Sequence, residues 1–153
     1  MLFVGGGFDY EELVKYATDI DVYDKCIFTG NVKDRQLLQA YYLRGDLLLF
    51  PSTFDMASIV QIEASAHKTP AVVVENSCSA EQIIDGENGF ICKENALSYA
   101  EKLEYLCSNP ELIKTVGENA FKTLYRTWDD VGEEVKQAYK EIITEYKTKK
   151  GKC

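Results

Sequence analysis

The stretch FPSTFDMASIVQIEASAHKTP, residues 50–70, lies between two apolar runs and decides the fold. Residues 47–50, which end at the first residue of this stretch, read Leu-Leu-Leu-Phe, and residues 71–74 after it read Ala-Val-Val-Val. Uniformly apolar strands that alternate with helices are typical of a parallel sheet covered on both faces. Ser58 and Gln61 form a capping box, which predicts a helix from Ser58 to about His67.

The same alternation extends in both directions from this stretch. Strands are expected at 2–4, 25–29, 46–50, 70–74 and 90–92, and helices at 10–18, 34–44, 58–67, 80–84, 96–107, 110–126 and 129–146. Asp9 and Asp34 are the expected caps of the first two helices, and Leu37 is expected to face inward. The chain is therefore expected to be an α/β protein, with one Rossmann-like domain over residues 1–146 and a basic tail at 147–153.

Composition and charge exclude several classes of protein. The 153 residues carry 17 Lys and Arg against 25 Asp and Glu, a net charge of −8, which argues against nucleic acid as a partner. No apolar run is long enough to span a bilayer, and the N-terminus does not resemble a signal peptide. The five cysteines lack CxxC spacing, so free thiols in the cytoplasm are expected. The four lysines of the tail favour a frayed end, with peripheral contact at the inner membrane face as the alternative.

Ligands of parallel α/β sheets bind beyond the carboxyl ends of the strands. The helix that starts at Ser58 would present its first amides there, which suits a phosphate or diphosphate. Asp55 and Glu63 would border the same crevice, where carboxylates accept hydrogen bonds from the hydroxyls of a sugar or ribose. The alternative is a surface helix with a good cap and two solvated acids.

Several segments together resemble the glycosyltransferases of the GT-B fold, family four type (group 1). Two acids separated by seven residues, here Asp55 and Glu63, are the hallmark of that family. The matching segments are Phe50-Pro51-Ser52, Glu63-Ala64, Pro70-Ala71-Val72-Val73, Phe3-Val4-Gly5-Gly6-Gly7, Ile27-Phe28-Thr29-Gly30-Asn31-Val32, Glu81, Asp85-Gly86-Glu87-Asn88-Gly89-Phe90, and Trp128 with Val131 and Tyr139. The resemblance covers nearly the whole chain and implies the donor-binding, C-terminal half of a GT-B fold.

The resemblance also implies roles for single residues. Asp55 would contact the donor sugar and Glu63 the ribose, as the catalytic pair. The implied donor-binding residues are the backbone amides of Ala57, Ser58 and Ile59 at the diphosphate, Asn31 and Val32 at the nucleobase, and Gly7 in the glycine loop. The implied reaction is retaining transfer of a hexose from a UDP-sugar or GDP-sugar to a glycan or lipid, without a metal or other cofactor.

Parts of the family pattern are missing from this chain. The first strand of the domain, with its Gly-Arg and following Lys, has no counterpart, and neither does the N-terminal acceptor domain. We therefore expect the chain to be inactive alone and its unpaired strand edges to favour a homodimer or strand exchange. Three residues also depart from the pattern, Asp55 for Glu, Ser58 for Gly and Lys68 for Gly.

Other functions remain open at this point. The three departures favour a non-catalytic interaction module or a degenerate partner subunit as the alternative function. A further alternative is another nucleotide-binding α/β domain without transfer activity. A dinucleotide loop at Gly5-Gly6-Gly7 is disfavoured because Tyr10 stands where its third glycine would be. His67 is expected to be an exposed residue at a helix end and not a catalytic base.

Overall fold

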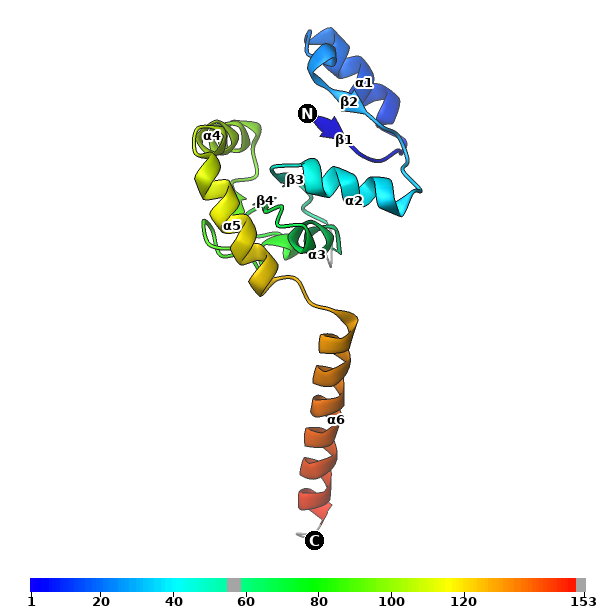
Figure 1. Ribbon diagram of the computed structural model, residues 1–153, viewed down its shortest axis with the longest axis vertical. Helices are drawn as coiled ribbons and strands as arrows, with labels where there is room; N and C mark the ends of the chain where they lie inside the picture. Colours follow the sequence, from blue (N-terminus) through cyan, green and yellow to red (C-terminus); the bar gives the residue numbers. More distant parts are fainter. Residues whose placement is uncertain (55–58, 151–153) are drawn as a thin grey trace. The chain divides into compact units, whose positions relative to one another are not determined.

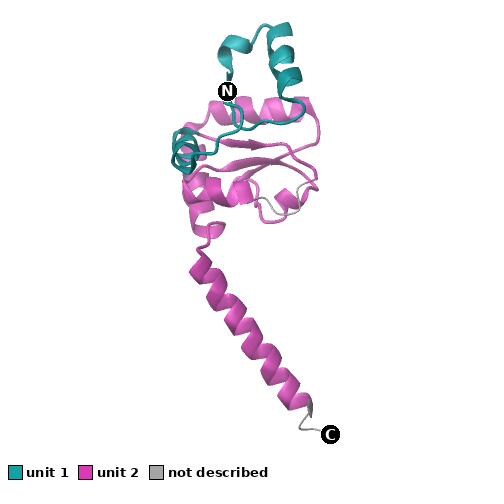
Figure 2. Cartoon of the chain, turned by 90° about the vertical axis from the view of Figure 1, so that its right-hand side faces the viewer, with its two compact units in different colours: residues 1–45 teal, residues 46–153 magenta. Residues whose placement is uncertain are grey.

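The computed structural model describes residues 1–54 and 59–150, and it divides the chain into two compact units. Unit 1 comprises Met1–Gly45 and unit 2 comprises Asp46–Cys153 (Figures 1 and 2). Both are built from short parallel strands with helices between them, so the predicted α/β class is confirmed. Each unit is described by itself below.

Unit 1 is a two-stranded parallel sheet with two helices. Its elements are β1 (Leu2–Phe3), α1 (Tyr10–Asp19), the 3₁₀ turn η1 (Tyr23–Lys25), β2 (Ile27–Phe28) and α2 (Arg35–Arg44). Leu2 pairs with Ile27 and Phe3 with Phe28, and the two phenylalanine rings stack with their centroids 4.7 Å apart. Of the described hydrophobic residues of unit 1, only Ala17 is fully buried, so this unit has a very small core of its own.

Of the two helix caps that the sequence predicts in unit 1, only one is present in the structure. Asp34 caps α2 as predicted, because its side chain accepts from the backbone N–H groups of Gln36 and Leu37. The predicted cap at Asp9 is wrong. Its φ of −91° and ψ of 4° are not the extended geometry that lets a capping side chain reach the first turn. The prediction that Leu37 faces inward is wrong, because it is 42% exposed in a unit that has only a very small core.

Unit 2 holds a three-stranded parallel sheet with the order β3-β4-β5. Its elements are β3 (Leu48–Phe50), α3 (Ile59–Ala66), β4 (Ala71–Val74), the 3₁₀ turn η2 (Cys78–Ala80), β5 (Phe90–Cys92), α4 (Ala96–Cys107), α5 (Pro110–Thr123) and α6 (Trp128–Lys150). The register pairs Leu49 with Val72 and Val73 with Ile91. The apolar runs that flank residues 50–70 are therefore neighbouring strands of one sheet.

The core of unit 2 covers both faces of this sheet, as the uniformly apolar strands predict. All four residues of β4 are buried. Ala71 and Val73 pack on one face with Ala120 and Leu124. On the other face Val72 packs with Phe90, Cys92, Leu106 and Val116. Because side chains alternate along a strand, a strand buried on both faces must be apolar at every position.

The strands expected at 25–29 and 46–50 are shorter, Ile27–Phe28 and Leu48–Phe50, and three helices differ most from the sequence-based prediction. The helix expected at 80–84 is the shorter 3₁₀ turn η2, α5 ends at Thr123 and not at 126, and α6 continues through Lys150 into the segment predicted to be a frayed tail. The described residues of α6 are exposed, apart from the half-buried Val131. No helix within residues 1–54 and 59–150 is long and apolar enough to cross a membrane.

Candidate functional site

In unit 1, the loops that follow β1 and β2 lie side by side. The N–H of Gly5 donates to the carbonyl of Gly30 over 2.9 Å. A Cβ placed on Gly6 would lie 3.5 Å from the backbone nitrogen of Asn31. The structure therefore brings the predicted glycine loop next to the predicted nucleobase loop. Gly7 and Asn31 are exposed, and Val32 is half-buried.

In unit 2, α3 is fixed to the loop after β4 by a buried side chain. Gln61 is only 8% exposed, and its Nε2 donates to the carbonyl of Ser79 over 3.0 Å. Ile59 begins the described part of α3 and has an exposed side chain. The other residues predicted around this helix start, Asp55, Ala57 and the capping residue Ser58, lie outside the described residues.

Glu63 lies one turn after Ile59 and is half-buried. Side chains in a helix generally lean toward its N-terminus, which for Glu63 is the side of the first turn of α3. The backbone carbonyl of Glu63 is 2.8 Å from Nδ1 of His67. His67 lies just after the end of α3, at the opposite end of the helix from Ile59, and it is half-buried, so the prediction that it is exposed is wrong.

A hollow of about 420 Å³ opens at the carboxyl end of β4. Its lining residues are Glu75, Asn76, Ser77, Cys78, Ala80, Glu81 and Ile91. Cys78 and Ala80 flank Ser79, the residue that Gln61 holds, so the hollow borders the anchored loop. Glu75 was not among the predicted site residues. Its position directly after the fully buried strand β4 is the sequence signal that could have identified it.

Hydrogen bonds within unit 2 hold the turn at residues 85–89 in place. Asn88 is 4% exposed and accepts from the N–H of Ile84 over 2.7 Å. Its amide also donates to the carbonyl of Gln82 and to Oγ1 of Thr123. These contacts tie the turn to the C-terminal end of α5 and position β5, which supplies Ile91 to the hollow.

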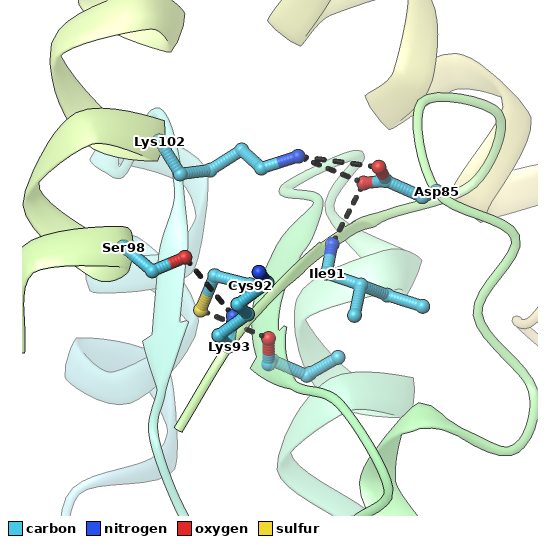
Figure 3. A network of polar contacts seen from close by, with 7 residues as sticks. Asp85, Ile91, Cys92, Lys93, Ser98 and Lys102 are labelled. Atoms are coloured by element: carbon cyan, nitrogen blue, oxygen red, sulfur yellow. Dashed lines mark hydrogen bonds and ion pairs between the residues drawn. The ribbon is translucent and has the colours of Figure 1, made fainter. Parts of the chain in front are cut away.

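Two ionisable groups near the sheet are held in their neutral forms. The thiol of Cys92 donates to the carbonyl of Val73 over 3.3 Å, and burial raises the pKa of that thiol (Figure 3). The hydroxyl of Tyr99 donates to the carbonyl of Val72 over 2.8 Å, and burial raises the pKa of this tyrosine. A thiol with a raised pKa is a poor nucleophile, so Cys92 has a packing role.

Lys68, one of the departures from the family pattern, has a structural explanation. Its φ is 61°, in the left-handed region where glycine is favoured. Its Nζ is 2.8 Å from Oε1 of Glu118, and this ion pair lowers the pKa of that carboxyl group. The substitution therefore concerns the turn between α3 and β4 and not the helix start at the other end of α3.

Comparison with solved structures shows which fold the chain has. The chain aligns with sucrose-phosphate synthase from Thermosynechococcus elongatus with a TM-score of 0.80 and 21% identity, over 94% of this chain and 38% of that one. It aligns with the Anabaena protein HepE, solved in complex with UDP, with a TM-score of 0.75 and 20% identity, over 94% and 40% of the two chains. These likenesses show the fold of the GT-B glycosyltransferases.

The sequence gives the family. The model of the family "Glycosyl transferases group 1" matches residues 1–123, so the chain belongs to the group 1 glycosyltransferases. It is also similar to the mouse alpha-1,3/1,6-mannosyltransferase ALG2, with 29% identity over 126 residues, which is 76% of this chain. The chain spans 30% of the length of that relative.

Proposed function

We propose that the chain is the donor-binding part of a retaining hexosyltransferase, which moves a hexose from a nucleoside diphosphate sugar to a glycan or lipid acceptor. The observation that carries this proposal is the placement of Glu63. It lies in the second turn of α3, and Gln61 fixes that helix to the loop at the carboxyl end of β4. The Anabaena protein HepE, which shares the fold, is solved with UDP and with UDP-glucose, in support of a nucleotide-sugar donor.

Each proposed role follows from the chemistry of the group. The Glu63 carboxylate accepts hydrogen bonds from the ribose hydroxyls, and Asp55 accepts them from the hydroxyls of the hexose. The amides of Ala57, Ser58 and Ile59 bind the diphosphate, because backbone N–H groups at a helix start favour anions. In unit 1, Asn31, Val32 and Gly7 belong to the two adjacent loops that contact the nucleobase and the donor.

The chain is proposed to bind its donor without transferring the sugar when it is alone. It spans 30% of the length of its mouse relative, so the acceptor site is proposed to lie in polypeptide outside this chain. Its net charge of −8 also opposes binding of a diphosphate. Amides with fixed geometry would then supply the binding energy, and affinity would fall little as salt is raised.

Calorimetric titration with UDP and with GDP tests the proposal. Glu63→Gln keeps the size of the side chain and removes its charge, so one or two charged hydrogen bonds to ribose weaken. At roughly 1.5–3 kcal/mol for a hydrogen bond to a charged group, the Kd for the bound nucleotide should rise about 10- to 100-fold. Glu101→Gln, an exposed acid in α4, is the matched control and should leave the Kd unchanged. Equal affinity of both variants would refute the role of Glu63.

A non-catalytic partner subunit is the second candidate, and Asp55 and Ser58 are the residues that favour it. Asp55 is one methylene shorter than the family glutamate, and Ser58 adds bulk where the family has glycine. Under this alternative the chain, completed with an acceptor domain of a relative, binds UDP but releases no sugar from UDP-glucose. Release of glucose with retained anomeric configuration, followed by NMR, supports the transferase instead.

A further inference from the structure

Local hydrogen bonds specify α6 as a helix of its own (Figure 1). Oδ2 of Asp130 accepts from the backbone N–H of Thr127 over 2.9 Å, and Oγ1 of Thr127 accepts from the N–H of Asp130 over 3.1 Å. These two reciprocal bonds form a capping box at the start of the helix. One turn further, Nζ of Lys136 lies 2.9 Å from Oε1 of Glu133.

The apolar side chains of α6 lie on one face of the helix. At 3.6 residues per turn, every residue from 128 to 146 that falls within one arc of about 100° is apolar. This apolar stripe comprises Trp128, Val131, Val135, Ala138, Tyr139, Ile142 and Tyr146. Its large side chains other than the half-buried Val131 are between 49% and 90% exposed.

A stripe of this kind is normally packed against another surface, because helices in proteins draw most of their stability from packing of an apolar face. The sequence of α6 increases this requirement. Gly132 and six β-branched residues lie within the helix, and both kinds of residue lower the intrinsic helix propensity. The question is therefore which surface the stripe fits.

The spacing of the stripe is that of a short two-stranded coiled coil. Trp128, Val135 and Ile142 follow one another at intervals of seven residues and occupy the a positions of a heptad. Val131 and Ala138 lie three residues after the first two of them and occupy d positions. The β-branched residues at two of the three a positions favour two parallel strands.

The residues that flank this seam decide the orientation. Glu134 and Glu141 occupy g positions, and Tyr139 and Tyr146 occupy e positions. In a parallel pair, a g residue of one copy faces the e residue five positions further along the other copy, so each glutamate meets a tyrosine hydroxyl that can donate to it. In an antiparallel pair, g faces g, and Glu134 would face Glu141 of the second copy. Like charges repel, so α6 complements itself in the parallel orientation.

The stripe is also large enough for a specific pair. Trp128, Tyr139 and Tyr146 are 90%, 64% and 59% exposed, and at about 200 Å² for a buried aromatic side chain they would together bury roughly 400 Å² in each copy. With the exposed parts of Val135 and Ile142, two copies would bury about 1,000 Å² in total, which is the area that a specific interface needs.

An anionic lipid surface fits α6 less well than a second copy does. Helices that bind such surfaces are rich in lysine and arginine on their polar face. The polar face of α6 carries acids as well as lysines, namely Asp130, Glu133, Glu141, Lys136, Lys140 and Lys147.

We propose that α6 pairs in parallel with α6 of a second copy of this chain through the apolar stripe, as a short two-stranded coiled coil. The stripe lies wholly on α6, so pairing leaves the fold of the rest of unit 2 unchanged. This homodimer depends on side-chain packing, whereas the homodimer expected from the sequence depends on unpaired strand edges.

Sedimentation velocity at about 1 to 200 µM tests the pairing, because association depends on protein concentration. The unmodified chain should change from monomer to dimer over this range. Ile142→Glu places a charge in the stripe and should raise the Kd of the dimer about 10-fold or more. Thr144→Glu adds the same charge on the opposite face of the helix and should leave the Kd within about 2-fold.

Circular dichroism of both variants at the lowest concentration shows whether their helix content is equal. Equal dimer affinity of the two variants would overturn the proposal. A chain that stays monomeric over the whole range would also overturn it, and sedimentation of that monomer with phosphatidylserine vesicles would assign the stripe to lipid instead.

A disulfide crosslink tests the parallel orientation. Cys153 comes three residues after the end of α6, and the ends of two parallel helices are adjacent. In an antiparallel pair the two ends would be about 35 Å apart, the length of the helix. A variant with Cys26, Cys78 and Cys107 replaced by serine keeps Cys153 and the buried Cys92. Mild oxidation should join its copies through Cys153, and a dimer that forms no such link would refute the parallel arrangement.

Discussion

Replacing Gly117 by alanine should strongly destabilise unit 2. It is buried in the middle of α5, beside the turn that joins α3 to β4. A Cβ at this position would lie 2.1 Å from the carbonyl oxygen of Lys68, 3.1 Å from its carbonyl carbon and 3.2 Å from Cδ of Pro70. These are atoms of the backbone and of a proline ring, so no side-chain rotation can relieve the overlap.

The size of the effect follows from these distances. Cβ atoms are essentially never closer than 3.0 Å to such a neighbour, so α5 and the turn must separate by at least 3.0 − 2.1 = 0.9 Å. Overpacking of this kind costs about 3 kcal/mol, the upper end of its usual range. Replacing glycine by alanine inside a helix returns about 1 kcal/mol. Gly117→Ala should therefore destabilise the chain by about 2 kcal/mol.

Urea unfolding followed by circular dichroism measures this difference, which corresponds to a decrease of about 1 M in the midpoint for a chain of this size. Gly132→Ala is the matched control, because it lies in the exposed helix α6 with no heavy atom within 4 Å of an added Cβ. It should leave the midpoint unchanged or raise it. If Gly117→Ala were as stable as the unmodified chain, the close approach of α5 to the α3–β4 turn would be wrong.

Three further results are expected. Asp85→Ala should lower the free energy of unfolding by about 1–3 kcal/mol, because it removes the side chain that accepts from the N–H of Ile91 in β5. Lys102→Met breaks only the partly exposed ion pair with Asp85 and should lower the free energy of unfolding by at most ~1 kcal/mol. Equal losses in urea titrations would contradict the role of the hydrogen bond between Asp85 and Ile91. Ending the chain after Thr127 should change the unfolding free energy by less than about 1 kcal/mol, since the described part of α6 buries almost nothing. A larger loss would show that α6 packs on the rest of unit 2. When the native protein is treated with iodoacetamide, peptide mapping should find Cys78 alkylated and Cys92 unmodified until urea unfolds the chain. Cys92 should be protected because it is buried and its thiol has a raised pKa. Alkylation of Cys92 in the native protein would refute this prediction.

The strands and most helices were predictable because their signals are local. The run at 71–74 is apolar at every position, a pattern that is typical of a strand covered on both faces in an α/β chain. Asp34 was predictable as a cap, since the next helix begins directly after it. Asp9 has the same residue type before a helix, but its backbone conformation prevents capping, and one sequence does not reveal that conformation.

Some features of the candidate site were likewise predictable from the sequence, and others were not. The glycine loop after β1 and the loop after β2 were both predicted to contact the donor, and the structure shows them bonded to each other through Gly5 and Gly30. Glu63 was predicted from its spacing to Asp55, which is also a local property. The anchor of α3 was not predicted, because Gln61 was expected to serve the helix cap, and its actual partner, Ser79, is 18 residues away.

The sequence by itself therefore determined the α/β class and the family, and it predicted the residues proposed to bind a nucleotide sugar, because each depends on residue types at fixed short spacings. Only the tertiary structure decided which polar groups form hydrogen bonds with one another. It separated Asp85 and Asn88, which hold the turn and β5, from the residues proposed to bind the donor. Hydrogen bonds between distant segments depend on how the backbone brings those segments together, and this cannot be read from local spacing.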